Sequence, residues 1–326
     1  MPKRATRKSA SRRPILKHPR TPPLTELNSA LRNVMSRPNV VACFVGERLR
    51  EGQETGQLAI VCCVTKKVAR GELDPRHDLL PRRITWDRTS ERSGRLPVDV
   101  QIADAEARWA GVPVAGPGDV VDRVIDNGAA MERPGTLGMA INHPVFGPVC
   151  LTAGHVVAPG THGSFTFPAD ERPLVHLVNG TNGSGDELFT GRVLKVSLTD
   201  TSDYAVVLPE NGLLSRNLYR DRFQLAGPFL PLPTDINRDV FVLTRGAIRR
   251  TRFRGVLGVF TVGGRPMRNL LITDFDTRAG DSGCCLVDDE MRVWGMLIGQ
   301  SIVNDRAVSV FMPALEPLIQ EQAEFV

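Results

Sequence analysis

The sequence lacks any run of 18 consecutive apolar residues, the minimum for a membrane-spanning helix. Its first twenty residues contain no acidic side chain and no apolar core of the kind that a secretory signal peptide carries. From these absences we expect a cytoplasmic protein that does not engage membranes.

Cysteine motifs for metal or redox chemistry are also missing, because the six cysteines include no C-x-x-C. Inside a cell such thiols stay reduced, and we expect them to be small core residues. His143, His162 and His176 have no ligand spacing with a cysteine or an acid. We therefore expect no metal and no cofactor.

Positive charge is concentrated at the start of the chain. Residues 1–20 hold eight Lys or Arg, and setting these aside lowers the net charge from +5 to −3. We expect residues 1–22 to form a basic disordered tail. Such a tail can bind nucleic acid through its charge, but it has no aromatic residue to stack on bases, so a nucleic-acid partner is the less favoured reading.

Short apolar runs, punctuated by 30 Gly and 24 Pro, dominate the rest of the chain. Apolar residues at helical spacing predict a helix over 24–37, and strands are predicted at 40–46, 58–65 and 96–102. We assign these elements to a small α/β domain, residues 23–112, and expect a linker at 111–118. The many short runs after residue 119 predict an all-β sandwich or barrel domain, residues 113–326, which ends in a short helix.

Three motifs in this second domain carry chemistry. Leu151-Thr-Ala-Gly-His155 delivers a histidine from a strand end, Ser202-Asp203-Tyr-Ala-Val begins a strand with an aspartate, and Gly280-Asp-Ser282-Gly places a serine between glycines. An imidazole can take the serine proton and return it to a leaving group, and a carboxylate can orient the imidazole. Asp200 is the alternative carboxylate.

These motifs resemble the signatures of the trypsin-like, or chymotrypsin-fold, serine peptidases, in the order of that family and over residues 130–320. The resemblance implies a mainly β fold of two six-stranded antiparallel barrels, with a C-terminal helix on the second barrel. It implies a triad of His155, Asp203 and Ser282 that acts through an acyl-enzyme, and an oxyanion hole from the backbone N–H groups of Gly280 and Ser282.

The same resemblance places Asp276, six residues before the nucleophile, at the base of the specificity pocket, where a carboxylate favours Arg or Lys substrates. Asp274 and Arg278 remain alternatives. Ile298, Gly299 and Gln300 match the strand that pairs with extended substrate. Where the family usually has Gly-Pro after its serine motif, this chain has Cys284-Cys285, which leaves open inhibition by oxidation.

The first domain is similar to a leader found ahead of cytosolic trypsin-like domains in bacteria and in some plant proteins. This similarity implies a regulated intracellular endopeptidase that processes a specific protein, with antiviral defence as one context and a regulatory partner on the first domain. The alternative is an inactive, peptide-binding adaptor.

Overall fold

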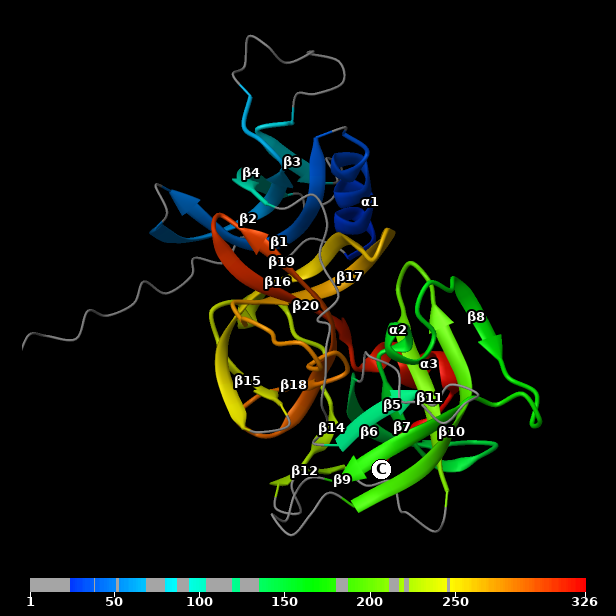
Figure 1. Cartoon of the computed structure of the whole chain (residues 1–326). Helices are drawn as coiled ribbons and strands as arrows, with labels where there is room; N and C mark the ends of the chain where they lie inside the picture. The colour runs from blue at the N-terminus through cyan, green and yellow to red at the C-terminus, as the bar shows by residue number, and fades with distance from the viewer. Residues whose placement is uncertain are drawn as a thin grey trace, which may run out of the picture.

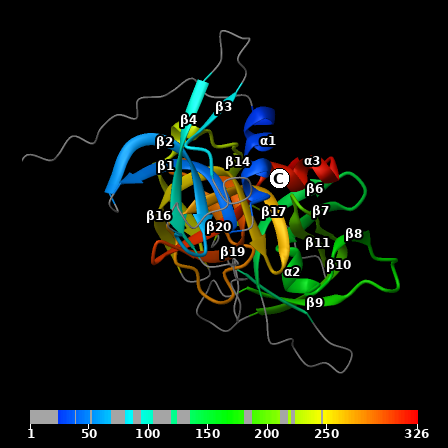
Figure 2. The same cartoon turned by 90° about the horizontal axis from the view of Figure 1, so that it is seen from above.

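The computed structural model describes residues 24–37, 39–50, 53–68, 80–86, 94–103, 119–123, 135–179, 187–210, 217–219, 223–244 and 247–326. The basic segment 1–22 and the expected linker 111–118 lie outside the described residues. Figures 1 and 2 show two β-rich bodies, with the N-terminal strands beside only one of them. No helix among the described residues is long and apolar enough to cross a membrane.

The first barrel is a closed sheet of six described strands in the order β11-β7-β6-β5-β9-β10, and it closes because β10 also pairs with β11. Its strands are β5 (Asp119–Arg123), β6 (Gly135–His143), β7 (Gly147–Thr152), β9 (Leu174–Asn179), β10 (Glu187–Leu198) and β11 (Asp203–Pro209). The short strands β8 (Gly163–Thr166) and β21 (Glu324–Phe325) pair with β10 and β6, and the one-turn helix α2 (Gly154–Val157) follows β7.

The second barrel closes in the same way among the described residues, in the order β15-β18-β19-β20-β17-β16 and back to β15. Its strands are β15 (Asp239–Leu243), β16 (Ile248–Val262), β17 (Arg265–Thr273), β18 (Cys285–Val287), β19 (Arg292–Val303) and β20 (Arg306–Pro313). Along the chain, four short elements lie between the strands of the two barrels: β12 (Leu218–Tyr219), β13 (Phe223–Gln224), β14 (Ala226–Pro228) and the 3₁₀ turn η2 (Pro233–Asp235). The expectation of a mainly β, double-barrel fold is confirmed.

The N-terminal elements extend the sheet of the second barrel. They are α1 (Leu24–Met35), β1 (Val40–Arg50), β2 (Gln53–Val64), β3 (Arg83–Trp86) and β4 (Gly94–Ile102). β1 pairs antiparallel with β16, and the order β16-β1-β2-β4-β3 continues outward from there. The helix and the three strands expected at the start of the chain are thus present, with the strands built into one continuous sheet with the barrel.

One core holds the N-terminal elements to the second barrel. Leu27 and Leu31 of α1 lie in the same buried cluster as Phe253, Trp294 and Phe311 of the barrel. The strands β1 and β16 can approach because a Cβ at Gly255 would lie 2.5 Å from the ring of Phe44, a distance that only glycine avoids. A large apolar interface therefore joins the two parts.

The C-terminal helix α3 (Leu315–Glu321) packs on the first barrel, so the implied position on the second barrel is wrong. Its apolar side enters the core through Leu318, which shares a buried cluster with Leu151 and Tyr204 of the first barrel. Its polar side faces the same strands, since the Tyr204 hydroxyl donates to Gln320 Oε1 at 3.0 Å and Lys195 Nζ lies 2.8 Å from Glu321 Oε1. Both the apolar and the polar face of α3 therefore contact the first barrel, the polar face through Lys195 of β10 and Tyr204 of β11.

Candidate active site

His155 is delivered by the tight connection from β7 into α2. Gly154 permits this connection, because a Cβ there would lie 2.9 Å from the carbonyl oxygen of Tyr204 on β11. Val156 and Val157 are buried in the first-barrel core and anchor the turn. The His155 side chain is 6 % exposed and is therefore held in one place by packing.

Asp203 is the first residue of β11 and is completely buried. Its Oδ1 accepts the backbone N–H of His155 at 3.1 Å, and its two oxygens lie 3.2 and 3.1 Å from His155 Nδ1. Because a carboxylate can only accept, these contacts assign the proton of the neutral imidazole to Nδ1. The other ring nitrogen, Nε2, is then an acceptor.

Ser282 approaches that acceptor from the second barrel, with its Oγ 3.0 Å from His155 Nε2. The serine is 1 % exposed. The three predicted side chains thus form one hydrogen-bonded chain across the contact between the barrels. Asp200, the alternative carboxylate, instead forms an ion pair with Arg268 at 2.9 Å.

The turn around Ser282 is fixed by hydrogen bonds to β6 of the first barrel. The Thr136 hydroxyl donates to Gly280 O at 2.6 Å, and the Thr136 N–H donates to Ser282 O at 2.7 Å. Gly280 has φ +93° and Gly283 has φ +98°, the left-handed region that favours glycine. A Cβ at Gly283 would lie 1.9 Å from Thr136 O, so this glycine is required for the two barrels to meet.

Asp281 holds the same turn. Its Oδ2 accepts the N–H of Arg278 at 2.7 Å. Burial raises the pKa of the Asp281 carboxyl, although this hydrogen bond and the charges of Arg249 and Arg278 act in the opposite direction.

Arg265 also contacts the candidate site, and no sequence motif pointed to it. It begins β17, and its Nη2 lies 2.9 Å from Asp203 Oδ2. Burial alone would raise the pKa of the Asp203 carboxyl, but His155 and Arg265 outweigh burial and lower that pKa. No local motif marks an arginine 62 positions away from its partner, and only the docking of the two barrels brings them together.

The residues expected to select substrate lie beside the serine turn. Asp276 is exposed, and its Oδ1 accepts Gln300 Nε2 at 3.0 Å, while Gln300 Oε1 accepts the Thr277 hydroxyl at 2.7 Å. Ile298 is buried, and Gly299 pairs with Val310 of β20. Asp274 pairs with Arg254 on the far part of β16, whereas Arg278 is exposed.

The two cysteines after the nucleophile are fully buried and free. Burial raises the pKa of the Cys285 thiol to about 12 and also raises that of Cys284. Among the described residues, no group of three His, Cys, Asp or Glu side chains could hold a metal ion.

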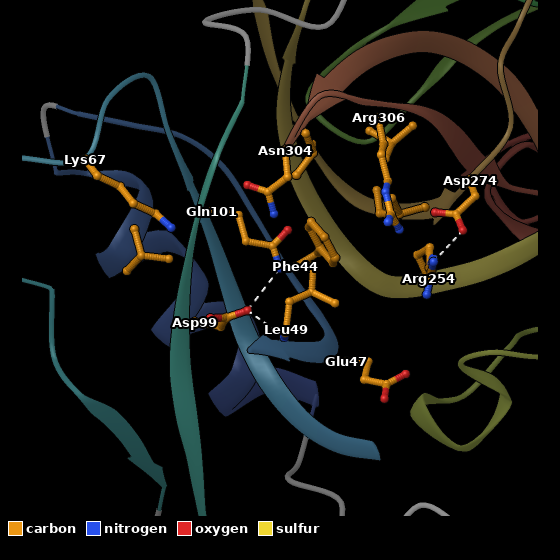
Figure 3. Close-up of a pocket in the computed structure, with 14 residues that line it drawn as sticks. Phe44, Glu47, Leu49, Lys67, Asp99, Gln101, Arg254, Asp274, Asn304 and Arg306 are labelled. Atoms are coloured by element: carbon orange, nitrogen blue, oxygen red, sulfur yellow. Dashed lines mark hydrogen bonds and ion pairs between the residues drawn. The ribbon is translucent and has the colours of Figure 1, made fainter. Parts of the chain in front are cut away.

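A separate cavity of about 310 Å³ lies where the N-terminal strands meet the second barrel (Figure 3). Its acids are already partnered: Asp99 accepts from Leu49 N–H and from Gln101, and Asp274 pairs with Arg254. The cavity contains none of the three motif residues, so it is not part of the candidate active site.

No protein-family model and no curated protein matches the sequence. Solved structures that match include several proteases. A Nocardiopsis protease is 14 % identical with a TM-score of 0.45, covering 67 % of this chain and 99 % of that chain. A Cellulomonas bogoriensis chymotrypsin is 18 % identical with a TM-score of 0.43, covering 67 % and 98 %. A glutamic-acid-specific serine protease is 16 % identical with a TM-score of 0.43, covering 65 % and 100 %.

Proposed function

We propose that this chain is a serine endopeptidase with Ser282 as nucleophile, His155 as general base and Asp203 as the carboxylate that orients the histidine. The observation that carries the proposal is the continuous chain of contacts from Ser282 Oγ through the imidazole to Asp203, at 3.0 Å and 3.1 Å. Its members come from two barrels and from motifs 127 positions apart.

In the first half of the reaction, the Ser282 oxygen attacks the scissile carbonyl carbon as its proton moves to His155 Nε2. Asp203, which accepts the Nδ1 proton, stabilises the imidazolium that results. The imidazolium then gives the proton to the leaving amine, and an acyl-enzyme on Ser282 remains. A water molecule deprotonated by His155 hydrolyses this ester and restores the serine.

The oxyanion of each tetrahedral intermediate is assigned to the backbone N–H groups of Gly280 and Ser282. Support comes from the fixed turn, in which Thr136 holds the carbonyl oxygens of both residues. Donors fixed before the reaction stabilise developing charge without the cost of reorganisation, and one such donor contributes about 3–4 kcal/mol in comparable sites.

For substrate we propose an extended protein or peptide segment bound along Ile298, Gly299 and Gln300. β18 pairs with β19 only as far as Met296, which leaves this part of the same β19 edge without a pairing strand among the described residues. The exposed Asp276 carboxylate supports a preference for Arg or Lys before the cleaved bond, since Gln300 is its uncharged partner.

Regulation is proposed to act through the N-terminal elements, residues 23–112, as an accessory unit of the peptidase. β1 pairs with β16, and β16 pairs with β17, which carries Arg265. A partner that shifts β1 would therefore shift a strand that contacts Asp203. Processing of a specific cytoplasmic protein by such a regulated enzyme is the proposed biological role.

The test is labelling with a fluorophosphonate probe, which reacts rapidly only with an activated serine. We expect labelling of the wild type and none of Ser282→Ala or His155→Ala. His162→Ala is the matched control, because His162 is exposed and does not belong to the hydrogen-bonded chain of Ser282, His155 and Asp203, and this variant should label normally. A peptide library then tests Arg and Lys preference, with Asp276→Asn expected to remove it.

The adaptor alternative predicts a different result. Binding of peptides without labelling of Ser282, in protein that melts in one transition, would identify a peptide-binding scaffold and refute the proposed hydrolysis.

A further inference from the structure

The β16–β17 hairpin of the second barrel reaches into the first barrel beside His155. Arg265, at the start of β17, has a side chain that is only 10 % exposed, and its partner Asp203 is fully buried. The 2.9 Å ion pair between them is therefore largely screened from water. It contacts the same carboxylate oxygen, Oδ2, that lies 3.1 Å from His155 Nδ1.

The geometry of the β16–β17 hairpin fixes the position of Arg265. Gly263 and Gly264, with φ +57° and +77°, form a two-residue turn that places Arg265 opposite Val262. Further along β17, the Arg268 N–H donates to Asp200 O at 2.8 Å, and the Arg268 side chain pairs with the Asp200 carboxylate. Two points of contact thus dock the hairpin onto the first barrel.

The guanidinium of Arg265 is directed at the carboxylate and has few other partners. Its Nε is buried without a hydrogen-bond acceptor, while Nη2 also lies 3.3 Å from Met267 Sδ. A buried cation is costly unless it is paired, and Asp203 is the anion that compensates this one. A residue that served only to join the barrels would not need this carboxylate, because Arg268 already makes such a link at the surface.

The charged and titratable groups around Asp203 come from both barrels. His155 from α2 and Arg265 from β17 are packed against Asp203, whereas Arg268 and Asp200 form their own ion pair. The ion pair with Arg265 restrains Asp203 Oδ2, and this carboxylate in turn holds the imidazole through Nδ1.

We propose that Arg265 is a positioning residue that fixes the Asp203 carboxylate from the second barrel and thereby holds the His155 imidazole oriented toward Ser282. The inference rests on the proposed function of the site. It also makes assembly of the catalytic chain depend on docking of the barrels, because the first barrel supplies His155 and Asp203 while the second supplies Ser282 and Arg265.

The experiment compares Arg265→Gln, Arg265→Lys and the matched control Arg268→Gln. For each, the rate of fluorophosphonate labelling is measured at pH 7. For Arg265→Gln we expect a labelling rate about tenfold lower, because the Asp203 carboxylate loses the charged group that fixes it. Arg265→Lys should restore part of this loss and label several-fold more slowly than the wild type, since an ammonium keeps the charge but lacks the planar fork. Arg268→Gln should match the wild type.

A folded Arg265→Gln variant with an unchanged labelling rate would overturn the inference. Should that variant fail to fold, the lysine variant decides, because an unchanged rate there removes the positioning role.

A second measurement does not depend on activity. The proton NMR resonance of the His155 Nδ1–H reports its hydrogen bond to Asp203, and it should shift in Arg265→Gln but not in Arg268→Gln. Absence of labelling in the wild type would count against the proposed peptidase, whereas an unshifted resonance in Arg265→Gln would overturn only the role of Arg265.

Discussion

The two barrels have the same closed six-strand plan among the described residues, but they are completed by different ends of the chain. The first barrel is covered by α3 from the C-terminal end and supplies His155 and Asp203. The second is extended by β1, β2, β4 and β3 from the N-terminal end and supplies Ser282 and Arg265. The proposed nucleophile therefore lies in the barrel whose sheet the N-terminal strands extend, and the proposed regulation through those strands would act on the serine side of the site.

The largest expected effect breaks the junction between the barrels. Gly283→Ala would force a Cβ against Thr136 O in the left-handed region, so we expect a loss of more than about 4 kcal/mol in the free energy of unfolding. The control Gly160→Ala has φ +75° but open space around its Cβ, and it should cost only about 1 kcal/mol. Urea unfolding measures both, and equal losses would show that the close contact with Thr136 is not limiting.

The next effect tests whether the N-terminal elements and the second barrel unfold together. Leu31→Ala on α1 removes a fully buried side chain from the shared core, which should cost about 3 kcal/mol. Because Trp294 lies in that same core, its fluorescence should change in the same shifted transition. The reference protein and the Leu31→Ala variant both carry Trp86→Phe and Trp109→Phe, so that Trp294 is the remaining tryptophan that reports unfolding.

The prediction would be contradicted by two separate unfolding transitions, if Leu31→Ala shifted only the transition in which the fluorescence of Trp294 does not change. They would establish residues 23–112 as an independent domain. The surface control is Ile319→Ala, 70 % exposed, which should change stability by less than about 0.5 kcal/mol.

A smaller effect concerns the helix on the first barrel. Tyr204→Phe removes the hydroxyl that donates to Gln320 and to Glu321 of α3, and we expect a loss of about 1–2 kcal/mol. Tyr219→Phe is the matched control, since its buried hydroxyl donates to Thr244 O at 2.6 Å and does not touch α3. Hydrogen exchange of the α3 amides should accelerate only in Tyr204→Phe, and equal protection in both variants would show that apolar packing alone holds the helix.

Local patterns predicted most of the strands and all three members of the hydrogen-bonded chain, because period-two apolar runs and short motifs carry that information within a few residues. They could not show the pairing of β1 with β16, which joins strands more than two hundred positions apart. Nor could they identify Arg265, because its partner belongs to the other barrel, or place α3, because its contact surface forms only after β10 and β11 are paired. These are all contacts between segments that lie far apart in the sequence, and local patterns carry no information about them.

The smallest expected effect compares the cysteines of the two barrels. Cys284 and Cys285 follow the nucleophile in the second barrel and are fully buried, whereas Cys150 on β7 of the first is partly exposed. Only the thiolate reacts with peroxide or iodoacetamide, and because burial raises the pKa of both Cys284 and Cys285, these thiols stay protonated and unreactive at pH 8. Mass spectrometry should find them unmodified after mild peroxide, with Ser282 labelling undiminished. Cys150→Ser controls for any loss of Ser282 labelling that is caused by oxidation in the first barrel. If peroxide inhibits labelling in Cys150→Ser but not in Cys284→Ala, then oxidation beside Ser282 does control the site.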